Sequence, residues 1–452
     1  MASAEIDSNL YDGTDERLLS PMQRLNRLLN LPLIPLVGLM ALFFATFGNL
    51  VNVAIDKDVV ALDKQVLLKL AVLAVGGLYG AMGFFSEPRV RRLLFALPVC
   101  WIVVILACYY LAVPGSVMQT ESLASAISIT CVLLMTLTCL VQHGPKTVLN
   151  AIFFAVSGFV VLSWFAYFFV PVIGVFEEPI ADGQFKARMS GLAHPNTLGQ
   201  FSGVLIVLAC ILHVNYKQMS WIRAGLVLLA VAALIGSLSR TSLLATVFAV
   251  AVVYREHVLK PKYFYALIGV GLLGLVGLLV MSINSDLGSV LESKLALLSK
   301  SGDTEELTSA TGRVDIWAYA IHLLSQRPIT GYGAATSKYH LVDYSLYTHN
   351  MILNIAFSAG AIAGVAAVLM CLGRAGQLCI RNHRLTDGLI AFILLNGLFE
   401  NVIFSILAGM PTIVWIVAMS IPSFEAIENS PPTEILSLRS PDDNGASPRR
   451  PR

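Results

Sequence analysis

Residues 147–170 read TVLNAIFFAVSGFVVLSWFAYFFV and contain no Asp, Glu, Lys or Arg. As a helix rising about 1.5 Å per residue, this run is long enough to cross the ~30 Å hydrocarbon core of a bilayer. The whole chain of 452 residues is 56% hydrophobic and 13% charged, whereas about a quarter of the residues of a soluble protein are charged. The sequence therefore predicts a membrane protein, and its net charge of +2 gives no indication of nucleic-acid binding.

Similar apolar runs recur along the chain, and we predict an all-α polytopic membrane protein of about twelve transmembrane helices. The predicted spans are residues 32–55, 66–86, 93–112, 123–141, 147–170, 196–214, 222–238, 241–254, 264–283, 349–371, 389–408 and 411–426. The seventh and eighth are short for a ~30 Å core. They are expected to form a tilted or partly re-entrant hairpin around Ser239 and Arg240.

The distribution of Lys and Arg predicts the orientation of the chain. With both termini in the cytoplasm, the inner segments hold 19 of these residues and the outer segments hold 10, which agrees with the excess of positive charge on cytoplasmic loops. This orientation divides the chain into a cytoplasmic tail (1–31), a transmembrane domain (32–428) and a disordered cytoplasmic tail (429–452). It also makes two long loops periplasmic, residues 171–195 and 284–348. Loops of that length are usually functional.

The second long loop contains TGRVDIWAYAIHLLSQRPITGYG, residues 311–333. Its apolar residues recur at spacings of three and four, which predicts a short amphipathic helix, with Val314, Trp317, Ile321 and Leu324 on the apolar face. Thr311 is expected to cap this helix and Pro328 to end it. Arg313 would then lie in the first turn, where the helix dipole disfavours a cation unless an anion is bound there too. The alternative is a solvated surface arginine.

Two further residues are candidates because of their position at the predicted outer surface. Arg240, in SLSRTS (237–242), is expected at the outer turn of the short hairpin, where a charge below the membrane surface indicates function; an interfacial, snorkelling arginine is the alternative. His349, in YTHNMILN (347–354), is expected in the first turn of the tenth span as a neutral base. A capping or interfacial histidine is the alternative, and Asn350 is a supporting residue.

Other polar side chains adjoin these candidates. In the segment RMSGLAHPNTLGQ, residues 188–200, Arg188 is a candidate anion ligand. His194 and Asn196 are supporting residues at the start of a helix, where their role can be structural. Glu400 is expected inside the eleventh span, next to Asn401, facing the protein interior and paired with a cation.

We predict no metal site and no cofactor. The sequence DKD at residues 56–58 has the spacing of a small metal site, but a solvated turn is the commoner occurrence of so short a pattern. The seven cysteines have no metal-ligand spacing. Several arginines beside a neutral histidine instead favour group transfer from a diphosphate-linked donor, because an arginine fork binds two phosphate oxygens and a histidine can remove a hydroxyl proton.

Four segments resemble, in order and spacing, the bacterial O-antigen ligase and O-antigen polymerase family. They are RMSGLAHPNTLGQ, SLSRTSLLA, TGRVDIWAYAIHLLSQRPITGYG and THNMILNIAFSAGAIAG, between about residues 186 and 372. The resemblance implies a GT-C-like helical fold in the bacterial inner membrane and metal-independent, inverting transfer of a glycan from undecaprenyl diphosphate at the periplasmic face. On this chain it implies Arg188, Arg240 and Arg313 at the diphosphate and His349 at the acceptor.

The sequence does not decide which acceptor receives the glycan. The long loop and both tails exceed the length of a minimal ligase, which favours polymerisation of a surface polysaccharide or exopolysaccharide. O-antigen ligation to the lipid A core is the alternative. A transporter of the same lipid-linked glycan without chemistry is a further alternative, although the sequence shows no internal repeat of the kind many transporters have. Other polysaccharide assembly proteins are possible partners.

Overall fold

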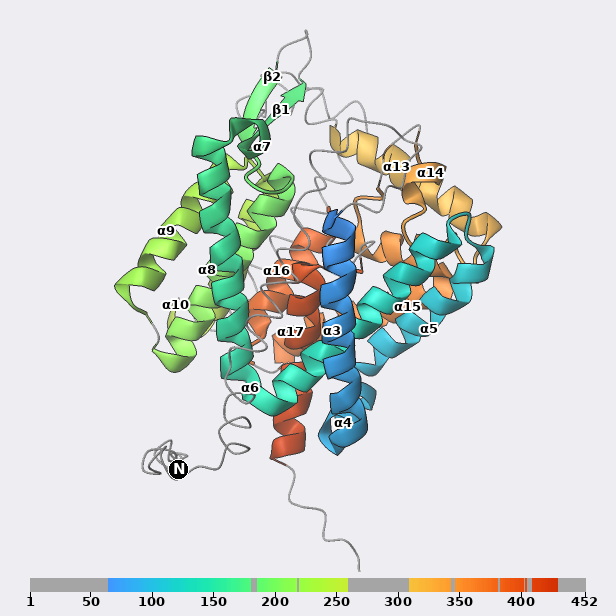
Figure 1. Cartoon of the computed structure of the whole chain (residues 1–452), viewed down its shortest axis with the longest axis horizontal. Coiled ribbons are helices and arrows are strands. Elements are labelled where there is room, and N and C mark those ends of the chain that lie inside the picture. The colour runs from blue at the N-terminus through green and yellow to red at the C-terminus, as the bar shows by residue number, and fades with distance from the viewer. Residues whose placement is uncertain are drawn as a thin grey trace, which may run out of the picture.

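The structure is a computed structural model that describes residues 64–179, 185–217, 219–258, 309–342, 345, 347–380, 383–401, 403–404 and 409–429. Both predicted tails, DKD and the predicted spans 32–55 and 264–283 lie outside these residues. The described chain is a bundle of helices with one small pair of strands at one end (Figure 1).

The first described helices are joined by a sharp bend. Helix α3 (Lys64–Ser86) runs into α4 (Pro88–Phe95) through a bend of 100°, and α5 (Cys100–Ala112) continues into the short helix η2 (Val113–Gly115). The predicted span 93–112 is therefore shorter than expected. Its first residues belong to α4, which lies at the same end of the bundle as the end of the last helix (Figure 1); Arg89 of α4 pairs there with Glu428.

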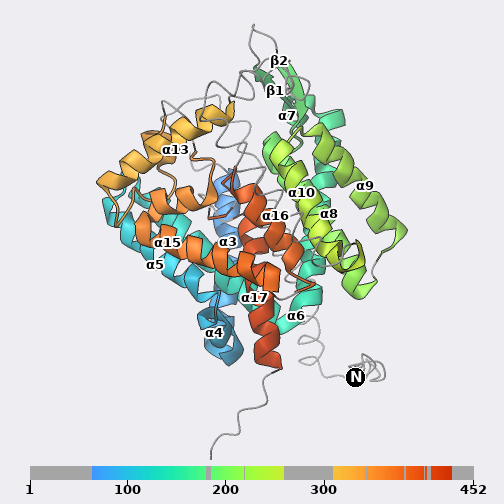
Figure 2. The ribbon, with the colours of Figure 1, turned by 180° about the vertical axis from the view of Figure 1, so that it is seen from behind.

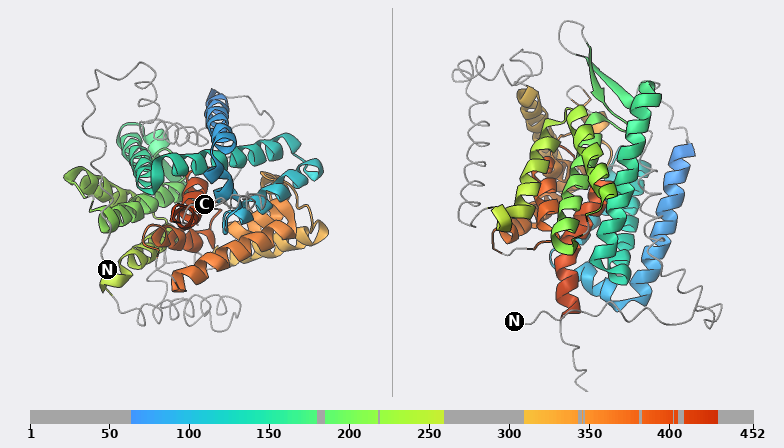
Figure 3. Two further views of the ribbon diagram at one scale, coloured as in Figure 1. Left: turned by 90° about the horizontal axis from the view of Figure 1, so that it is seen from below. Right: turned by 90° about the vertical axis from the view of Figure 1, so that its left-hand side faces the viewer.

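Helix α6 (Gln119–Phe169) contains two of the predicted spans, 123–141 and 147–170. It is broken at Gly144, which has φ 73° and ψ 166°, and Pro145 follows. Only glycine adopts such a conformation readily, and proline cannot continue the hydrogen-bond ladder of a helix. The break turns α6 into two legs, so the long helix passes through the bundle twice (Figures 1 and 3).

A β-hairpin follows the second leg of α6, which corrects the all-α prediction. After the single turn α7 (Pro171–Gly174), strands β1 (Val175–Pro179) and β2 (Phe185–Met189) pair antiparallel, with Phe176 opposite Arg188. Apolar and polar residues do not alternate in VFEEP, so a period of two did not reveal the strand. The hairpin projects from the end of the bundle opposite to α4 (Figure 3).

The next helices match the sixth to eighth predicted spans. Helix α8 (Pro195–Tyr216) is a core helix, whereas α9 (Trp221–Gly236) and α10 (Arg240–Val258) pack on either side of it. The turn between α9 and α10 approaches α8 closely at Gly199. A Cβ there would lie 2.7 Å from Cβ of Ser239 and 3.0 Å from Oγ of Ser237. This contact holds the SLSRTS turn against the start of α8.

The described part of the second long loop contains the predicted amphipathic helix, α13 (Ser309–Gln326), and the single turn α14 (Ser337–His340). Helix α13 begins before Thr311, so Thr311 is not its cap and Arg313 lies beyond the first turn. Its buried face also differs from the predicted one, because Ile316 and Ala320 are buried while Ile321 is 57% exposed. Its buried face is the one that packs on α15 (Figure 2).

The last helices are interrupted in places that hydropathy does not show. Helix α15 (Met351–Ile380) is broken at Gly360, with φ 87° and ψ 173°. Helix α16 (Asp387–Gly397) ends well before residue 408, where the eleventh span was expected to end, and α17 begins at Met410 and ends at Glu428. Glu400 and Asn401 therefore lie in the segment between α16 and α17, not inside a helix. Asn396 and Gly397 are weak helix formers. Glu400 and Asn401 find polar partners in this segment, Asn196 and Thr348 respectively.

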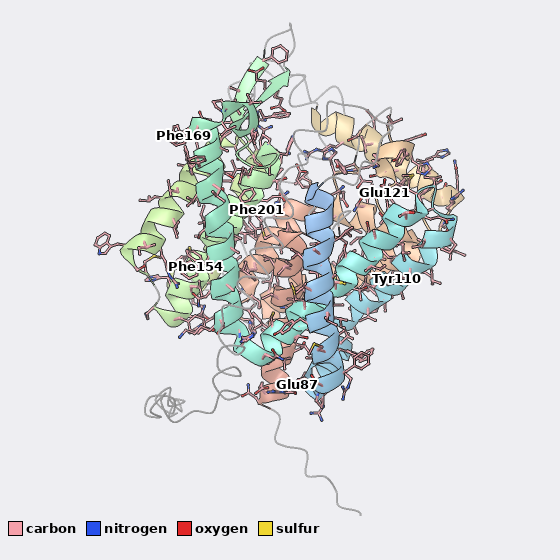
Figure 4. The ribbon with its side chains drawn as sticks, in the orientation of Figure 1. Glu87, Tyr110, Glu121, Phe154, Phe169 and Phe201 are labelled. Carbon is pink, nitrogen blue, oxygen red and sulfur yellow. The ribbon has the colours of Figure 1, made fainter. Side chains whose placement is uncertain are left out.

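Length and composition identify four described helices that can cross a membrane, or up to five if the bent pair α3–α4 counts as one span. The protein is thus a mostly helical, polytopic membrane protein. Its core includes the large buried side chains of Tyr109, Phe153, Phe159 and Trp415, while apolar side chains such as Phe154 and Phe169 on the second leg of α6 are exposed (Figure 4), as expected of a surface that meets lipid.

Candidate active site

Arg188 joins the hairpin to the turn between α9 and α10. It lies on β2 and is only 5% exposed. Its Nε and Nη2 atoms donate to the carbonyl oxygen of Ser237 at 2.9 and 2.7 Å, Nη1 donates to Glu178 Oε2 at 3.0 Å, and Nη2 also donates to Asn196 Oδ1 at 2.9 Å. Four of the five N–H groups of the guanidinium are used by these bonds. Arg188 is therefore held rigidly, with its charge compensated by Glu178.

Glu400 connects three of the residues that the sequence singled out. Its Oε1 atom accepts a hydrogen bond from Asn196 Nδ2 at 3.0 Å and lies 3.5 Å from Arg313 Nη2, while its Oε2 atom lies 3.6 Å from His349 Nδ1. The Glu400 residue is 8% exposed. Because Asn196 also binds Arg188, these contacts form one continuous polar cluster from Arg188 to His349. We call these five residues, Arg188, Asn196, Arg313, His349 and Glu400, the Glu400 cluster.

His349 is not in the first turn of its helix, which corrects the expected position. It adopts a left-handed backbone conformation with φ 49°, two residues before α15 begins at Met351. Asn350 caps the start of α15, because its Oδ1 atom accepts a hydrogen bond from the backbone N–H of Leu353 at 2.9 Å. The His349 side chain, 29% exposed, is thereby displaced from the helix axis toward Glu400.

The two ring nitrogens of His349 have different surroundings. Nδ1 is buried and has no hydrogen-bond partner in the described part of the chain; Glu400 Oε2, at 3.6 Å, is just beyond hydrogen-bond range. Nε2 lies 3.1 Å from the hydroxyl oxygen of Ser345. A proton on Nδ1 would face a carboxylate, which leaves Nε2 as the nitrogen that can accept a proton from a hydroxyl group.

Three helices start beside the Glu400 cluster. His194 precedes the first residue of α8, Arg240 is the first residue of α10, and Asn350 precedes the first residue of α15. The N-terminus of a helix carries a partial positive charge and unsatisfied N–H groups, which favour bound anions. Arg240 is exposed at its helix start, just after the turn whose carbonyl group binds Arg188.

His194 caps α8 through the backbone of Asn196, a member of the Glu400 cluster. Its Nδ1 atom accepts a hydrogen bond from the backbone N–H of Asn196 at 3.3 Å. Desolvation lowers the pKa of His194 below its usual 6.5, and the positive charge of Arg188 lowers it further. The neutral form is the one that can accept this bond, so His194 serves the helix start in its unprotonated state.

Further side chains brace the segment that carries Glu400. Asn350 Nδ2 donates to the carbonyl oxygen of Leu398 at 3.1 Å, and Thr348 Oγ1 lies 3.1 Å from Asn401 Oδ1. These contacts tie the residues before α15 to the break after α16. They explain how an acid can be fixed in a segment without regular helix.

A small pocket of about 130 Å³ lies under the hairpin, next to Arg188. Its lining residues are Trp164, Tyr167, Val175, Ala187, Arg188, Met189 and Gly236. Arg188 therefore lines this pocket and also belongs to the Glu400 cluster.

Sequence reasoning missed three partners in this region. They are Glu178, which pairs with Arg188; the carbonyl group of Ser237, which accepts two bonds from Arg188; and Ser345, which faces His349. The adjacent acids Glu177 and Glu178 in an otherwise apolar stretch were a usable signal. A backbone carbonyl acceptor leaves no signal in the sequence.

The described part of the chain contains no group of three or more His, Cys, Asp or Glu side chains arranged to hold a metal ion. Asp56 and Asp58 lie outside the described residues. The polar groups that the structure does bring together are arginines, amides, one histidine and one carboxylate, a set suited to binding an anion and moving a proton.

Residues 224–369 match the family model described as O-antigen ligase. This region includes Arg240, Arg313 and His349, and it confirms the resemblance over the last three of the four segments; Arg188, Asn196 and Glu400 lie outside it. No curated protein matches the chain.

Proposed function

On the premise that this chain carries an O-antigen ligase region at residues 224–369, we propose that it transfers a glycan from undecaprenyl diphosphate to an acceptor hydroxyl at the periplasmic face of a bacterial inner membrane. The observation that carries the proposal is the Glu400 cluster. It joins two arginines and a histidine from separate parts of the chain around one buried carboxylate.

The arginines provide the charge that a diphosphate leaving group needs. In the cluster, Arg188 and Arg313 are compensated by Glu178 and Glu400, so the surroundings are close to neutral before the donor binds. Arg313 is the more available of the two, because its side chain is 27% exposed and its contact with Glu400 is long, at 3.5 Å. We assign Arg313 and the exposed Arg240 to the phosphate oxygens. The buried Arg188 instead fixes the hairpin to the turn between α9 and α10.

His349 is assigned as the general base. The acceptor hydroxyl gives its proton to Nε2, and its oxygen attacks the anomeric carbon from the side opposite to the diphosphate. The bond between that carbon and the phosphate oxygen breaks, and undecaprenyl diphosphate leaves with the electron pair. This single displacement inverts the configuration. Glu400, facing Nδ1, stabilises the imidazolium that forms.

The acceptor decides between the two candidate enzymes. Polymerisation uses a second lipid-linked repeat unit, and we retain it as the first candidate because of the long loop and tails. Ligation to the lipid A core is favoured by the description of the matching family. Purified protein in liposomes should be given labelled lipid-linked glycan together with either acceptor. A longer lipid-linked product supports the polymerase, and a labelled lipid A core supports the ligase.

The same assay tests whether the protein is an enzyme at all. Release of undecaprenyl diphosphate together with a new glycosidic bond is expected. Movement of the labelled lipid across the liposome membrane without a new bond would instead support a transporter, and the assignment of His349 as a base would then be wrong.

A further inference from the structure

Helix α15 lacks one turn of its own hydrogen bonds, and a loop from elsewhere replaces them. At the Gly360 break, the carbonyl oxygens of Phe357 and Ser358 accept hydrogen bonds from the backbone N–H groups of Tyr332 and Gly333, each at 2.9 Å. The N–H of Ala361 donates to the carbonyl oxygen of Pro328 at 2.6 Å. Because α15 is a candidate membrane span, these backbone groups need partners within the protein.

Two glycines make this contact possible. Gly331 has φ 64°, and a Cβ atom there would lie 2.6 Å from the carbonyl oxygen of Phe357 and 2.7 Å from the backbone nitrogen of Gly360. A Cβ atom on Gly360 would overlap the carbonyl group of Ile329. Both residues also have a backbone conformation that other residues rarely adopt. At these two glycines the loop and the helix therefore meet backbone to backbone, too close to admit a side chain.

The docked loop belongs to a hydrophobic cluster separate from the main core. This cluster contains the buried residues Ile316, Ala320, Tyr332, Leu341 and Phe357. Tyr332 stacks on Phe357 with ring centroids 5.0 Å apart, and its hydroxyl group donates to the carbonyl oxygen of Leu323 at 2.9 Å.

A further bond reaches the residues that precede α15. Trp317 Nε1 donates to the carbonyl oxygen of Thr348, next to His349, at 2.8 Å. Helix α13, the loop after it and the first part of α15 are thus packed together, as Figure 2 shows.

We propose that residues 309–342 and 347–359 form one positioning module, locked by the docking of residues 328–333 on the α15 break, which sets Arg313 and His349 at a fixed separation. Gly331 and Gly360 are then positioning residues for glycosyl transfer, although both lie away from the reacting groups. This inference rests on the proposed function.

The rate of transfer and the affinity for the donor should depend differently on this lock. Arg188 and Asn196 lie outside the module, on the hairpin and α8. Arg188 bonds Asn196, Asn196 bonds Glu400, and Glu400 contacts Arg313 of the module. If the lock is disturbed, the base and Arg313 move relative to the bound donor while the rest of the donor site stays in place. The rate of transfer should therefore fall far more than donor affinity, because a displacement of about 1 Å can cost on the order of 100-fold in rate.

The test compares Gly331→Ala and Gly360→Ala with Gly373→Ala, in liposomes containing the full chain. Gly373 lies on the same helix, and a Cβ atom there would meet nothing within 4 Å. Both lock variants are expected to lose transfer on the order of 100-fold, to bind labelled lipid-linked donor within about threefold of the native protein, and to exchange the backbone hydrogens of Tyr332 and Gly333 faster. Gly373→Ala should behave as the native protein in all three measurements.

The outcomes are distinguishable. Faster exchange at Tyr332 and Gly333 with normal transfer would mean that the lock is merely structural and would overturn the inference. No transfer by the native protein and by Gly373→Ala would instead contradict the proposed function. If neither lock variant can be isolated folded, Tyr332→Phe decides, because it removes the bond that ties the docked loop to Leu323 of α13, the helix that carries Arg313. Reduced turnover with unchanged donor binding supports the module, and unchanged turnover overturns it.

Discussion

The Nδ1 atom of His349 lies 3.6 Å from Oε2 of Glu400, so the residues before α15 meet the break between α16 and α17 where an imidazole faces a carboxylate. Glu400 also accepts a hydrogen bond from Asn196 and lies 3.5 Å from Arg313. One carboxylate thus adjoins the residue assigned as base, the arginine assigned to the phosphate and the amide that reaches Arg188. Its charge should influence each of their roles.

Glu400→Gln keeps an oxygen acceptor for Asn196 but removes the negative charge facing His349 and Arg313. We expect turnover to fall by about 30-fold, corresponding to about 2 kcal/mol for a lost hydrogen bond to a charged group. Glu425→Gln is the matched control, since Glu425 pairs with His383 near the far end of α17. Equal turnover of the two variants would remove Glu400 from the site.

His349→Ala should separate binding from chemistry. The arginines remain, so lipid-linked donor should still bind, while the acceptor loses its base and turnover falls by about 10²- to 10⁴-fold. Donor binding and turnover should be measured separately on the same preparation. His322→Ala is the control, because His322 is exposed on α13 and contacts Gln326. Loss of donor binding in His349→Ala would place His349 in the lipid site instead.

Arg313→Lys keeps the charge and loses the planar fork, so two bonds to diphosphate oxygens become one. We expect a loss of about 2–3 kcal/mol in transition-state stabilisation, measured from kcat/KM. Arg384→Lys offers a comparison, because its ion pair with Glu256 is exposed at the opposite end of the bundle. If the two variants lose the same activity, Arg313 acts only as a surface charge.

The His194 cap predicts a pH dependence of stability. Burial lowers the folded-state pKa below 6.5, so between these two values the unfolded chain binds more protons than the folded chain. The stabilising contribution is fully present above pH 6.5 and is lost as the pH falls through the folded-state pKa. His194→Asn keeps a capping side chain that does not titrate. Melting temperatures from about pH 8 to about pH 5 should fall less in His194→Asn than in the native protein; parallel curves would contradict the cap.

The orientation is tested by labelling single cysteines from outside intact cells, in a chain whose seven native cysteines are replaced. Phe185 on the hairpin is 66% exposed, and Met219 between α8 and α9 is 43% exposed at the opposite end. An impermeant thiol reagent should modify Phe185→Cys and not Met219→Cys. The reverse result would put the Glu400 cluster on the cytoplasmic side, away from any periplasmic acceptor.

The helices and the residues of the cluster could be predicted from the sequence, but the breaks could not. The start of α8 and the whole of α17 agree with the predicted spans within a residue or two, because long apolar runs between charged ends leave few alternatives. Hydropathy does not reveal that α16 ends at Gly397 or that α15 is broken at Gly360, because the composition stays apolar across both places.

The partners within the cluster were less accessible to sequence reasoning than its members. A charge in an apolar context marks Arg188 and Glu400 as unusual. Nothing in the sequence, however, indicates that the side chain of Asn196 hydrogen-bonds to both of them. That contact depends on how α8 packs beside the α16–α17 break. The β-hairpin was missed for a related reason: its strands are short, and the bond between Arg188 and Glu178 that joins them leaves no periodic pattern in the sequence.

The shortness of α9 has a consequence for the surrounding bilayer. With 16 residues, α9 is about 24 Å long, and its Leu228 and Ile235 side chains are exposed. It is shorter than a ~30 Å hydrocarbon core, and lipid beside a short helix thins to match it. We therefore expect the headgroup layer to dip toward the Glu400 cluster. A hydrophilic sugar chain could then reach the carboxylate from the aqueous phase while its isoprenoid anchor stays dissolved among the acyl chains.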